Sequence, residues 1–340
     1  SQRPGYPGAL VYIWDNIGDV GGGAMFSFLI VFWLTPVQAL VAAHLPLLAA
    51  ALFLQAPGRR PGPARCLAAA AMFLALLAAV AAENSTLTPS GGELAHYRET
   101  RHGRITVIRQ RELVTLFQDG VPMLSSQDQA LAEESVHYAL AQTEDPQRLL
   151  LVSASAGVMG ELEKYRLASI DYVELDPDLT KVLFDFNLLK RLPGLRVIHA
   201  DGRAFLASAA PGYDAILVNL NDPQTFQANR FFTDRFFSVA RSRLSAQGVL
   251  AFSMGGFDSY LAEAQRRKLS SVYHTARAYF SDVLMLPGER VFFICGNRPL
   301  QAGVPDLLER KGIEAPYISG TYEGNVTPER ISELRSRMEP

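Results

Sequence analysis

The chain has 340 residues, 49% of them hydrophobic, and its 32 Lys and Arg against 34 Asp and Glu give a net charge of −2 at pH 7. This composition excludes a disordered or collagen-like chain, and the near-neutral charge argues against a nucleic-acid-binding protein, which needs a basic face. The two cysteines are too few for a disulfide framework or a cysteine zinc site.

Charge is distributed unevenly, because residues 1–83 carry only four basic and three acidic side chains. Apolar segments at about 9–34, 37–55 and 66–82 predict three transmembrane helices, since one helix across the first two would overshoot a hydrocarbon core of about 30 Å. The alternative is an apolar hairpin with a buried core helix. No signal-peptide pattern precedes them. Since the chain opens with Ser1 rather than Met, we also expect that the membrane part continues upstream.

The side of the membrane stays open. The linker at 56–65 holds three arginines, which places it in the cytoplasm by the positive-inside rule. Three spans would then deliver the remaining chain to the opposite face. Additional upstream helices, or a third segment that does not span, would reverse this orientation.

Beyond the apolar segments the pattern changes to strands. Two β-branched runs at 104–109 and 113–118, with Asp119-Gly120 as the next turn, predict a small β-hairpin domain. Further strands alternate with helical stretches, at 149–153, 170–175, 197–199, 215–220, 249–253, 283–286 and 291–295. This alternation predicts an α/β, doubly wound, Rossmann-like parallel sheet. The turn at 287–289 is too short for a crossover, so we expect the last strand to run antiparallel.

The carboxyl ends of these strands carry the candidate chemistry. Glu174 follows Gly157 by 17 residues and can accept both ribose hydroxyl hydrogens, the alternative being an exposed strand-end acid. Asp201 can bind an adenine amino group or cap the next helix. The first loop argues against a nucleoside site, because only Gly157 and Gly160 remain in a turn that usually needs glycines.

Several of these motifs together resemble one known family. They are LFQDG at 116–120, SQD at 126–128, DYVELD at 171–176, DGR at 201–203 and DP at 222–223. They are similar to the spermidine synthase (polyamine aminopropyltransferase) family over residues 97–297, and the membrane portion looks like the end of a transporter-like bundle fused to some bacterial members. The resemblance implies a class I methyltransferase-type fold and a multi-pass location in a bacterial inner membrane.

The expected segments are transmembrane helices at 1–83, a linker and small β domain at 84–130, a Rossmann-like domain at 131–298 and a polar tail at 299–340. By resemblance, Glu174 binds the ribose, Asp201 contacts the adenine, and Gly157 and Gly202 belong to the same nucleoside site. Asp222 matches the family acid that helps hold the polyamine.

Other positions depart from the family pattern. The general-base Asp is Asn219 here, and an amide cannot accept a proton at neutral pH. The family's Asp against the aminopropyl ammonium falls on Ala156. Further departures are Met123 for Gln, Gln129 for Glu, and Leu131 or Ala132 for Tyr, while either Glu133 or Glu134 represents the next Glu. The losses fall on the two cationic substrates, so efficient spermidine synthesis is not expected.

Three hypotheses follow, and the sequence leaves enzymatic activity open. The chain is a divergent transferase that uses S-adenosylmethionine or its decarboxylated form, a non-catalytic accessory subunit of a membrane complex, or a transporter-linked sensor. Expected partners are the lipid bilayer, other subunits of such a complex and, by family resemblance, a second copy of the chain. No motif of a metalloprotease, a hydrolase or a P-loop is present.

Two side chains near the site have structural interpretations that we prefer. His137 with the Glu133-Glu134 pair supplies too few ligands for a metal site, and a satisfied core histidine is favoured. Arg230 is expected to pair with Asp234 at i+4 rather than to bind a substrate carboxylate.

Overall fold

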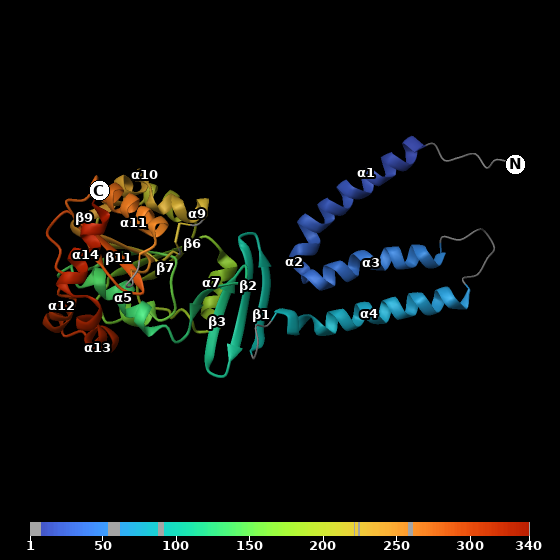
Figure 1. The fold of residues 1–340 in the computed structure, drawn as a ribbon, viewed down its shortest axis with the longest axis horizontal. Helices are drawn as coiled ribbons and strands as arrows, with labels where there is room; N and C mark the ends of the chain where they lie inside the picture. The colour runs from blue at the N-terminus through green and yellow to red at the C-terminus, as the bar shows by residue number, and fades with distance from the viewer. Residues whose placement is uncertain are drawn as a thin grey trace. The chain divides into compact units, whose positions relative to one another are not determined.

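The structure is a computed structural model that describes residues 8–53, 62–87, 92–220, 222–223, 225–257 and 261–339 (Figure 1). These residues belong to two compact units. The first comprises Ser1–Glu112 and Phe117–Gly120, and the second comprises Leu113–Leu116 and Val121–Pro340. Most of the predicted arginine linker at 56–65 and part of the polar loop that follows the third apolar segment lie outside the described residues.

Helices occupy the apolar segments of the first unit. They are α1 (Gly8–Met25), the π-helical η1 (Phe26–Ile30), α2 (Val31–Trp33), α3 (Pro36–Phe53) and α4 (Pro63–Leu87). The first three run without a break until Leu34, whose extended backbone ends the helix before Pro36. The stretches Gly8–Trp33 and Pro63–Glu83 are long and apolar enough to cross a membrane, whereas Pro36–Leu52 is shorter.

A buried carboxylate joins two of these helices. Glu83 of α4 accepts a hydrogen bond from Thr35 Oγ1 at 2.5 Å and another from the Val37 amide at 3.1 Å. Because the first amides of a helix have no partner within the helix, this carboxylate caps α3 from outside. The contact fixes the start of α3 against the end of α4.

The small sheet has four strands in the order β1-β2-β3-β4. They are β1 (Glu93–Thr100), β2 (Gly103–Gln110), β3 (Leu113–Gln118) and β4 (Val121–Ser125). The predicted runs at 104–109 and 113–118 are β2 and β3. Sequence reasoning missed β1, whose charged residues hide the apolar alternation, and β4, which contains Pro122.

Seven strands form the main sheet, in the order β10-β11-β9-β8-β5-β6-β7. Their bounds are β5 (Arg148–Val152), β6 (Ser169–Glu174), β7 (Leu195–His199), β8 (Tyr213–Val218), β9 (Leu244–Gly255), β10 (Asp282–Leu286) and β11 (Arg290–Gly296). Strands β5 to β9 pair in parallel, and β11 runs antiparallel to both β9 and β10. The Rossmann-like prediction with its antiparallel last strand is confirmed.

Helices cover both faces of this sheet (Figure 1). They are α5 (Gln129–Leu140), α6 (Val158–Leu162), α7 (Pro177–Asp185), α8 (Gly202–Ser208), α9 (Phe226–Asn229), the 3-10 turn η2 (Arg230–Phe232), α10 (Asp234–Arg243) and α11 (Glu263–Arg277). Alternate residues such as Leu150 and Val152 of β5 pack with α8, α10 and α11 in one core. The opposite face meets α5, where Tyr138 packs edge-on against Phe292 of β11.

The polar tail belongs to the second unit. It forms α12 (Val304–Lys311), α13 (Pro316–Asn325) and α14 (Pro328–Met338). Leu334 and Met338 of α14 enter the core on the α10 and α11 side, and the Ile318 amide of α13 donates to Glu133 Oε2 at 3.0 Å. From the sequence, residues 299–340 are predicted only as a polar tail. In the structure it packs on the domain.

Candidate functional site

Strands β6, β5 and β8 are neighbours in the sheet, so the residues at their carboxyl ends meet at one edge. Three buried polar atoms at this edge have no hydrogen-bond partner among the described residues. They are Glu174 Oε2 after β6, Ser155 Oγ after β5 and Asn219 Nδ2 after β8. Buried polar atoms are nearly always paired, so three unpaired atoms on adjacent strand ends indicate a ligand site.

One carboxylate oxygen of Glu174 is hydrogen-bonded to the backbone, and the other has no hydrogen-bond partner among the described residues. The residue is 8% exposed, and its Oε1 accepts hydrogen bonds from the amides of Leu175 at 2.7 Å and Asp176 at 3.2 Å. Burial raises the pKa of Glu174, and these amides partly offset that rise. The backbone therefore orients the carboxylate, while its second oxygen is buried without a hydrogen-bond partner among the described residues, and the Ser153 and Tyr172 side chains act on the same carboxylate.

The loop after β5 has a left-handed backbone at two positions, and only one of them is a glycine. Ser153 has a φ of 56°, which is uncommon for a residue with a Cβ and stores strain of about 1 kcal/mol or more. Gly157 has a φ of 81° and precedes α6. A Cβ on Gly157 would lie 2.9 Å from the Ala132 side chain, so this glycine is required by backbone and packing alike.

Asp201 uses both carboxylate oxygens within the chain. Its Oδ1 caps α8 by accepting from the amides of Arg203 at 2.9 Å and Ala204 at 3.2 Å. Its Oδ2 lies 2.9 Å from Nη2 of Arg230. The expected pairing of Arg230 with Asp234 is therefore wrong, because η2 separates the two residues and turns Arg230 toward the end of β7.

Gly202 has a packing role in the structure. A Cβ at this position would lie 2.9 Å from Val152 Cγ1 and 3.2 Å from the Phe231 ring. The start of α8 thus packs closely on β5 and η2. Whether Gly202 also contacts a nucleoside stays a prediction.

Asp222 lies beside the ends of β9 and β11 and is engaged by two cations. Its Oδ1 accepts from the Gly255 amide at 2.7 Å and lies 3.5 Å from Arg290 Nη2, while its Oδ2 accepts from Lys268 Nζ. The side chain is 14% exposed. Sequence reasoning missed both cations, because Lys268 lies in a basic helical run and Arg290 at a strand start, and neither spacing points to the site.

The neighbouring acids Glu133 and Glu134 have different surroundings. Glu133 is fully buried and accepts hydrogen bonds from Gln129 and from the Ile318 amide. Glu134 accepts from the Tyr138 hydroxyl at 3.1 Å. Burial, with the nearby carboxylates of Glu289 and Asp128, raises the pKa of Glu134 to about 7. Glu134 can therefore exchange a proton near neutral pH.

His137 is part of a buried network between α5 and α6. Its Nδ1 lies 2.8 Å from the Tyr165 hydroxyl and its Nε2 lies 2.7 Å from Glu161 Oε2. Glu161 also accepts from Gln129 and Lys164. Both ring nitrogens are thus satisfied, as a structural histidine requires. Within the described ranges, no group of three or more His, Cys, Asp and Glu is placed to hold a metal ion.

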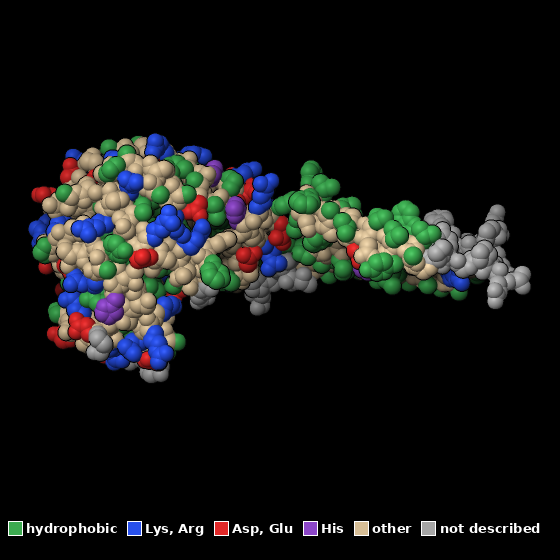
Figure 2. Space-filling view, turned by 90° about the horizontal axis from the view of Figure 1, so that it is seen from above, with side chains coloured by type: hydrophobic (Ala, Val, Ile, Leu, Met, Phe, Trp, Pro, Cys, Tyr) green, Lys and Arg blue, Asp and Glu red, His purple; other side chains and the backbone are tan. Residues whose placement is uncertain are grey.

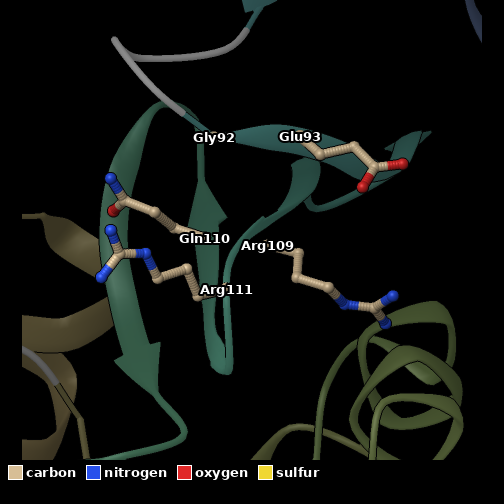
Figure 3. A pocket seen from close by; sticks show the side chains of 5 residues that line it. All are labelled: Gly92, Glu93, Arg109, Gln110 and Arg111. Atoms are coloured by element: carbon tan, nitrogen blue, oxygen red, sulfur yellow. The ribbon is translucent and has the colours of Figure 1, made fainter.

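Two hollows in the described residues contain none of the predicted site residues. One lies at the ends of β1 and β2 and is lined by Gly92, Glu93, Arg109, Gln110 and Arg111 (Figure 3). The other lies among α12, α13 and α14. The first is an open hollow on a single hairpin, and the unpaired buried atoms at the strand ends are the stronger sign of a site.

Solved structures share the fold of this chain. A spermidine synthase in complex with the transition-state analogue AdoDATO aligns with a TM-score of 0.60 at 16% identity, covering 72% of this chain and 88% of the other. The spermidine synthase of Thermotoga maritima aligns with a TM-score of 0.57 at 14% identity and the same coverage. The chain therefore has the Rossmann-like α/β fold of these two synthases.

The sequence then defines the family. Residues 116–299 match the family described as the spermine/spermidine synthase domain, and the chain belongs to it. A polyamine aminopropyltransferase of Oceanobacillus iheyensis is 30% identical over 46% of this chain and 33% of its own length. Polyamine aminopropyltransferase 2 of Aquifex aeolicus is 24% identical over 87% of this chain and 63% of its own. The chain thus spans less than two thirds of these relatives.

Proposed function

We propose that this chain is a membrane-anchored, spermidine-synthase-like protein whose site takes an S-adenosyl nucleoside and which does not make spermidine efficiently. The observation that carries the proposal is the unpaired Glu174 Oε2, buried beside the unpaired Ser155 Oγ at the ends of β6 and β5. A ribose supplies two hydroxyl donors for such a carboxylate. S-adenosylmethionine and its decarboxylated form, both substrates rather than resident cofactors, offer this ribose.

The chemistry expected from the family is weakened in the part of the site that would hold the amine substrates. Asn219 replaces the base, and its amide can donate to a ligand but cannot take a proton from an attacking amine. Ala156 is 3% exposed and supplies no carboxylate to an aminopropyl ammonium. Each lost carboxylate removes a charge-assisted hydrogen bond of about 1.5 to 3 kcal/mol. The residues proposed to bind the nucleoside are thus retained, whereas those that would activate the amine are not.

Exposed apolar side chains support membrane anchoring. Almost all of the large exposed hydrophobic residues lie between Leu10 and Leu77, and Figure 2 shows apolar side chains gathered over these helices. The window of the first spanning stretch is 0% buried and that of the second is 6% buried, whereas a core helix of a soluble protein is mostly buried. Lipid is the solvent that suits this surface, in a bacterial inner membrane by family resemblance.

A second candidate is a non-catalytic role, as an accessory subunit or a ligand sensor in a membrane complex. Two observations favour it over an ordinary synthase. The base is Asn219, and the carboxylates of Asp201 and Asp222 are both paired with cations of the chain itself. In this candidate the nucleoside site is empty or binds without chemistry.

Calorimetry on the full chain in detergent micelles tests the proposal, with methylthioadenosine, S-adenosylmethionine and decarboxylated S-adenosylmethionine as ligands. We expect at least one to bind, and Glu174→Ala to weaken it tenfold or more. Glu163→Ala, an exposed acid paired with Lys190, is the matched control and keeps wild-type affinity. No heat from any of the three ligands with folded protein would overturn the nucleoside proposal and favour the non-catalytic role.

A further inference from the structure

Asp222 is an acid of the polyamine side that this chain keeps, and its carboxylate is already bound by the chain's own cations. Lys268 Nζ from α11 donates to Oδ2, and Arg290 Nη2 from the start of β11 lies 3.5 Å from Oδ1. The Gly255 amide completes the shell at 2.7 Å. An ammonium and a guanidinium thus occupy the place where the ammonium of a polyamine would pair.

The two cations come from different elements of the same unit. Arg290 Nε donates to Ser253 Oγ at 2.8 Å and its Nη2 to the Ser253 carbonyl at 3.2 Å. Lys268 lies in the middle of α11, and its side chain is 28% exposed, close to the 27% of Arg290. Ser253 therefore anchors Arg290, whereas the side chain of Lys268 extends from α11 to Asp222.

A polyamine in solution competes poorly with these side chains. A tethered cation has an effective concentration in the millimolar range or above, so it outcompetes a free amine at lower concentration. The incoming ammonium would also approach two like charges, which disfavours binding. The acids that act electrostatically on Arg290 include Asp128 as well as Asp222, and Asp128 and Glu289 also act on Glu134.

The geometry points to Lys268 and Arg290 as specificity-determining residues that keep polyamines off Asp222, so that the acceptor is a molecule without a second ammonium group at this position. This inference rests on the proposed function, since it assigns the acceptor class of the same site. The two cations act independently of the base lost at Asn219, because a restored base alone would leave the Asp222 carboxylate paired with Lys268 and Arg290.

The test is a gain of binding in the full chain in detergent. Spermidine and putrescine are titrated into wild type and into the double variant Lys268→Met with Arg290→Gln, each with and without saturating methylthioadenosine. We expect wild type to bind neither amine below millimolar concentration, and the double variant to bind spermidine at least tenfold more tightly. Adding Asp222→Asn to the double variant should remove that gain.

Controls separate this inference from general charge effects and from the proposed function. Arg267→Met removes an exposed cation of the same helix that pairs with Glu263, and should not raise spermidine affinity. If the double variant unfolds, the single variant Lys268→Met makes the same comparison. A dissociation constant below about 1 mM for spermidine and the wild-type chain would overturn the inference. So would folded variants that bind spermidine no more tightly than wild type. Failure of methylthioadenosine to bind would instead overturn the proposed function, and the titrations without nucleoside would still decide the role of the cations.

Discussion

Arg230 and Asp201 form an ion pair across the end of β7, with Nη2 of the arginine 2.9 Å from Oδ2 of the aspartate. The two side chains are 41% and 28% exposed, and an ion pair this open to water contributes at most about 1 kcal/mol. Since Oδ1 caps α8, Oδ2 is the atom that an adenine amino group would have to reach. In the proposed nucleoside site, this arginine would therefore compete with the nucleobase for Asp201 Oδ2.

Replacing this arginine should strengthen nucleoside binding. Arg230→Ala frees Asp201 Oδ2 while the cap on α8 stays in place, so we expect the affinity for methylthioadenosine to rise about 1.4-fold to fivefold, as a pair worth about 0.2 to 1 kcal/mol allows. Calorimetry measures the change, and Arg235→Ala, in the first turn of α10, should leave affinity unaltered. Weaker binding in Arg230→Ala would mean that the guanidinium itself contacts the ligand.

Glu134 should make stability depend on pH around neutrality. Its pKa in the folded chain is about 7, above the value of an exposed glutamate, so the folded state binds a proton that the unfolded state has already lost. The loss of stability caused by ionising Glu134 in the folded chain is absent below the ordinary pKa near 4.5. It grows as the pH rises toward 7 and is complete above that value. We expect Glu134→Gln to raise the melting temperature at pH 8 relative to wild type, and to raise it little at pH 5.

A neighbouring acid in the same helix provides the comparison. Glu133→Gln changes a buried carboxylate that accepts from the Ile318 amide, so it should lower the melting temperature at both pH values. A melting difference between Glu134→Gln and wild type that does not change from pH 5 to pH 8 would refute the raised pKa.

The parallel sheet and the site edge could be predicted from the sequence because parallel strands are buried on both faces. Runs such as 149–153 and 215–220 are nearly continuous apolar stretches, and turn residues mark where each strand ends. That places Glu174, Asp201 and Asn219 at one edge without any coordinates. The antiparallel last strand follows from a turn of three residues.

The partners of these side chains were not accessible, because they come from segments distant in sequence. Lys268 and Arg290 reach Asp222 across 46 and 68 residues, and helix periodicity says nothing about such pairs. The pairing of Arg230 with Asp234 failed for a related reason. The i+4 pairing assumed one helix through both residues, whereas Thr233 begins α10 by capping the Phe236 amide, which places the two residues on different elements.

The buried network around Glu161 should be lost in acid. Hydrogen bonds from His137, Lys164 and Gln129 outweigh burial, the largest single cause, and lower the pKa of Glu161 to about 2. Because its folded pKa lies below the ordinary value of 4.5, the stabilisation is present above that value and disappears as pH falls toward 2. At neutral pH it amounts to at most about 3 kcal/mol. Glu161→Gln should therefore lower the melting temperature by several degrees at pH 7 and by progressively less below pH 4.5.

An exposed acid in the same turn tests whether burial matters for this effect. Glu163→Gln disrupts only the surface pair with Lys190. It should change the free energy of unfolding by less than about 1 kcal/mol at any pH. An equal effect of the two variants would contradict the role assigned to the network.

Gly157 and Gly160 should respond in opposite ways to substitution by alanine. Gly157 has a φ of 81° and no room for a Cβ beside Ala132, whereas Gly160 lies within α6 and a Cβ added there would meet no neighbouring heavy atom within 4 Å. We expect Gly157→Ala to destabilise the chain by about 1 kcal/mol or more and to weaken methylthioadenosine binding, because the loop that carries Ser155 must shift. Gly160→Ala should be neutral or stabilise by up to about 1 kcal/mol. Melting curves and calorimetry on both variants decide the point: if Gly157→Ala keeps wild-type affinity, the first loop does not shape the nucleoside site.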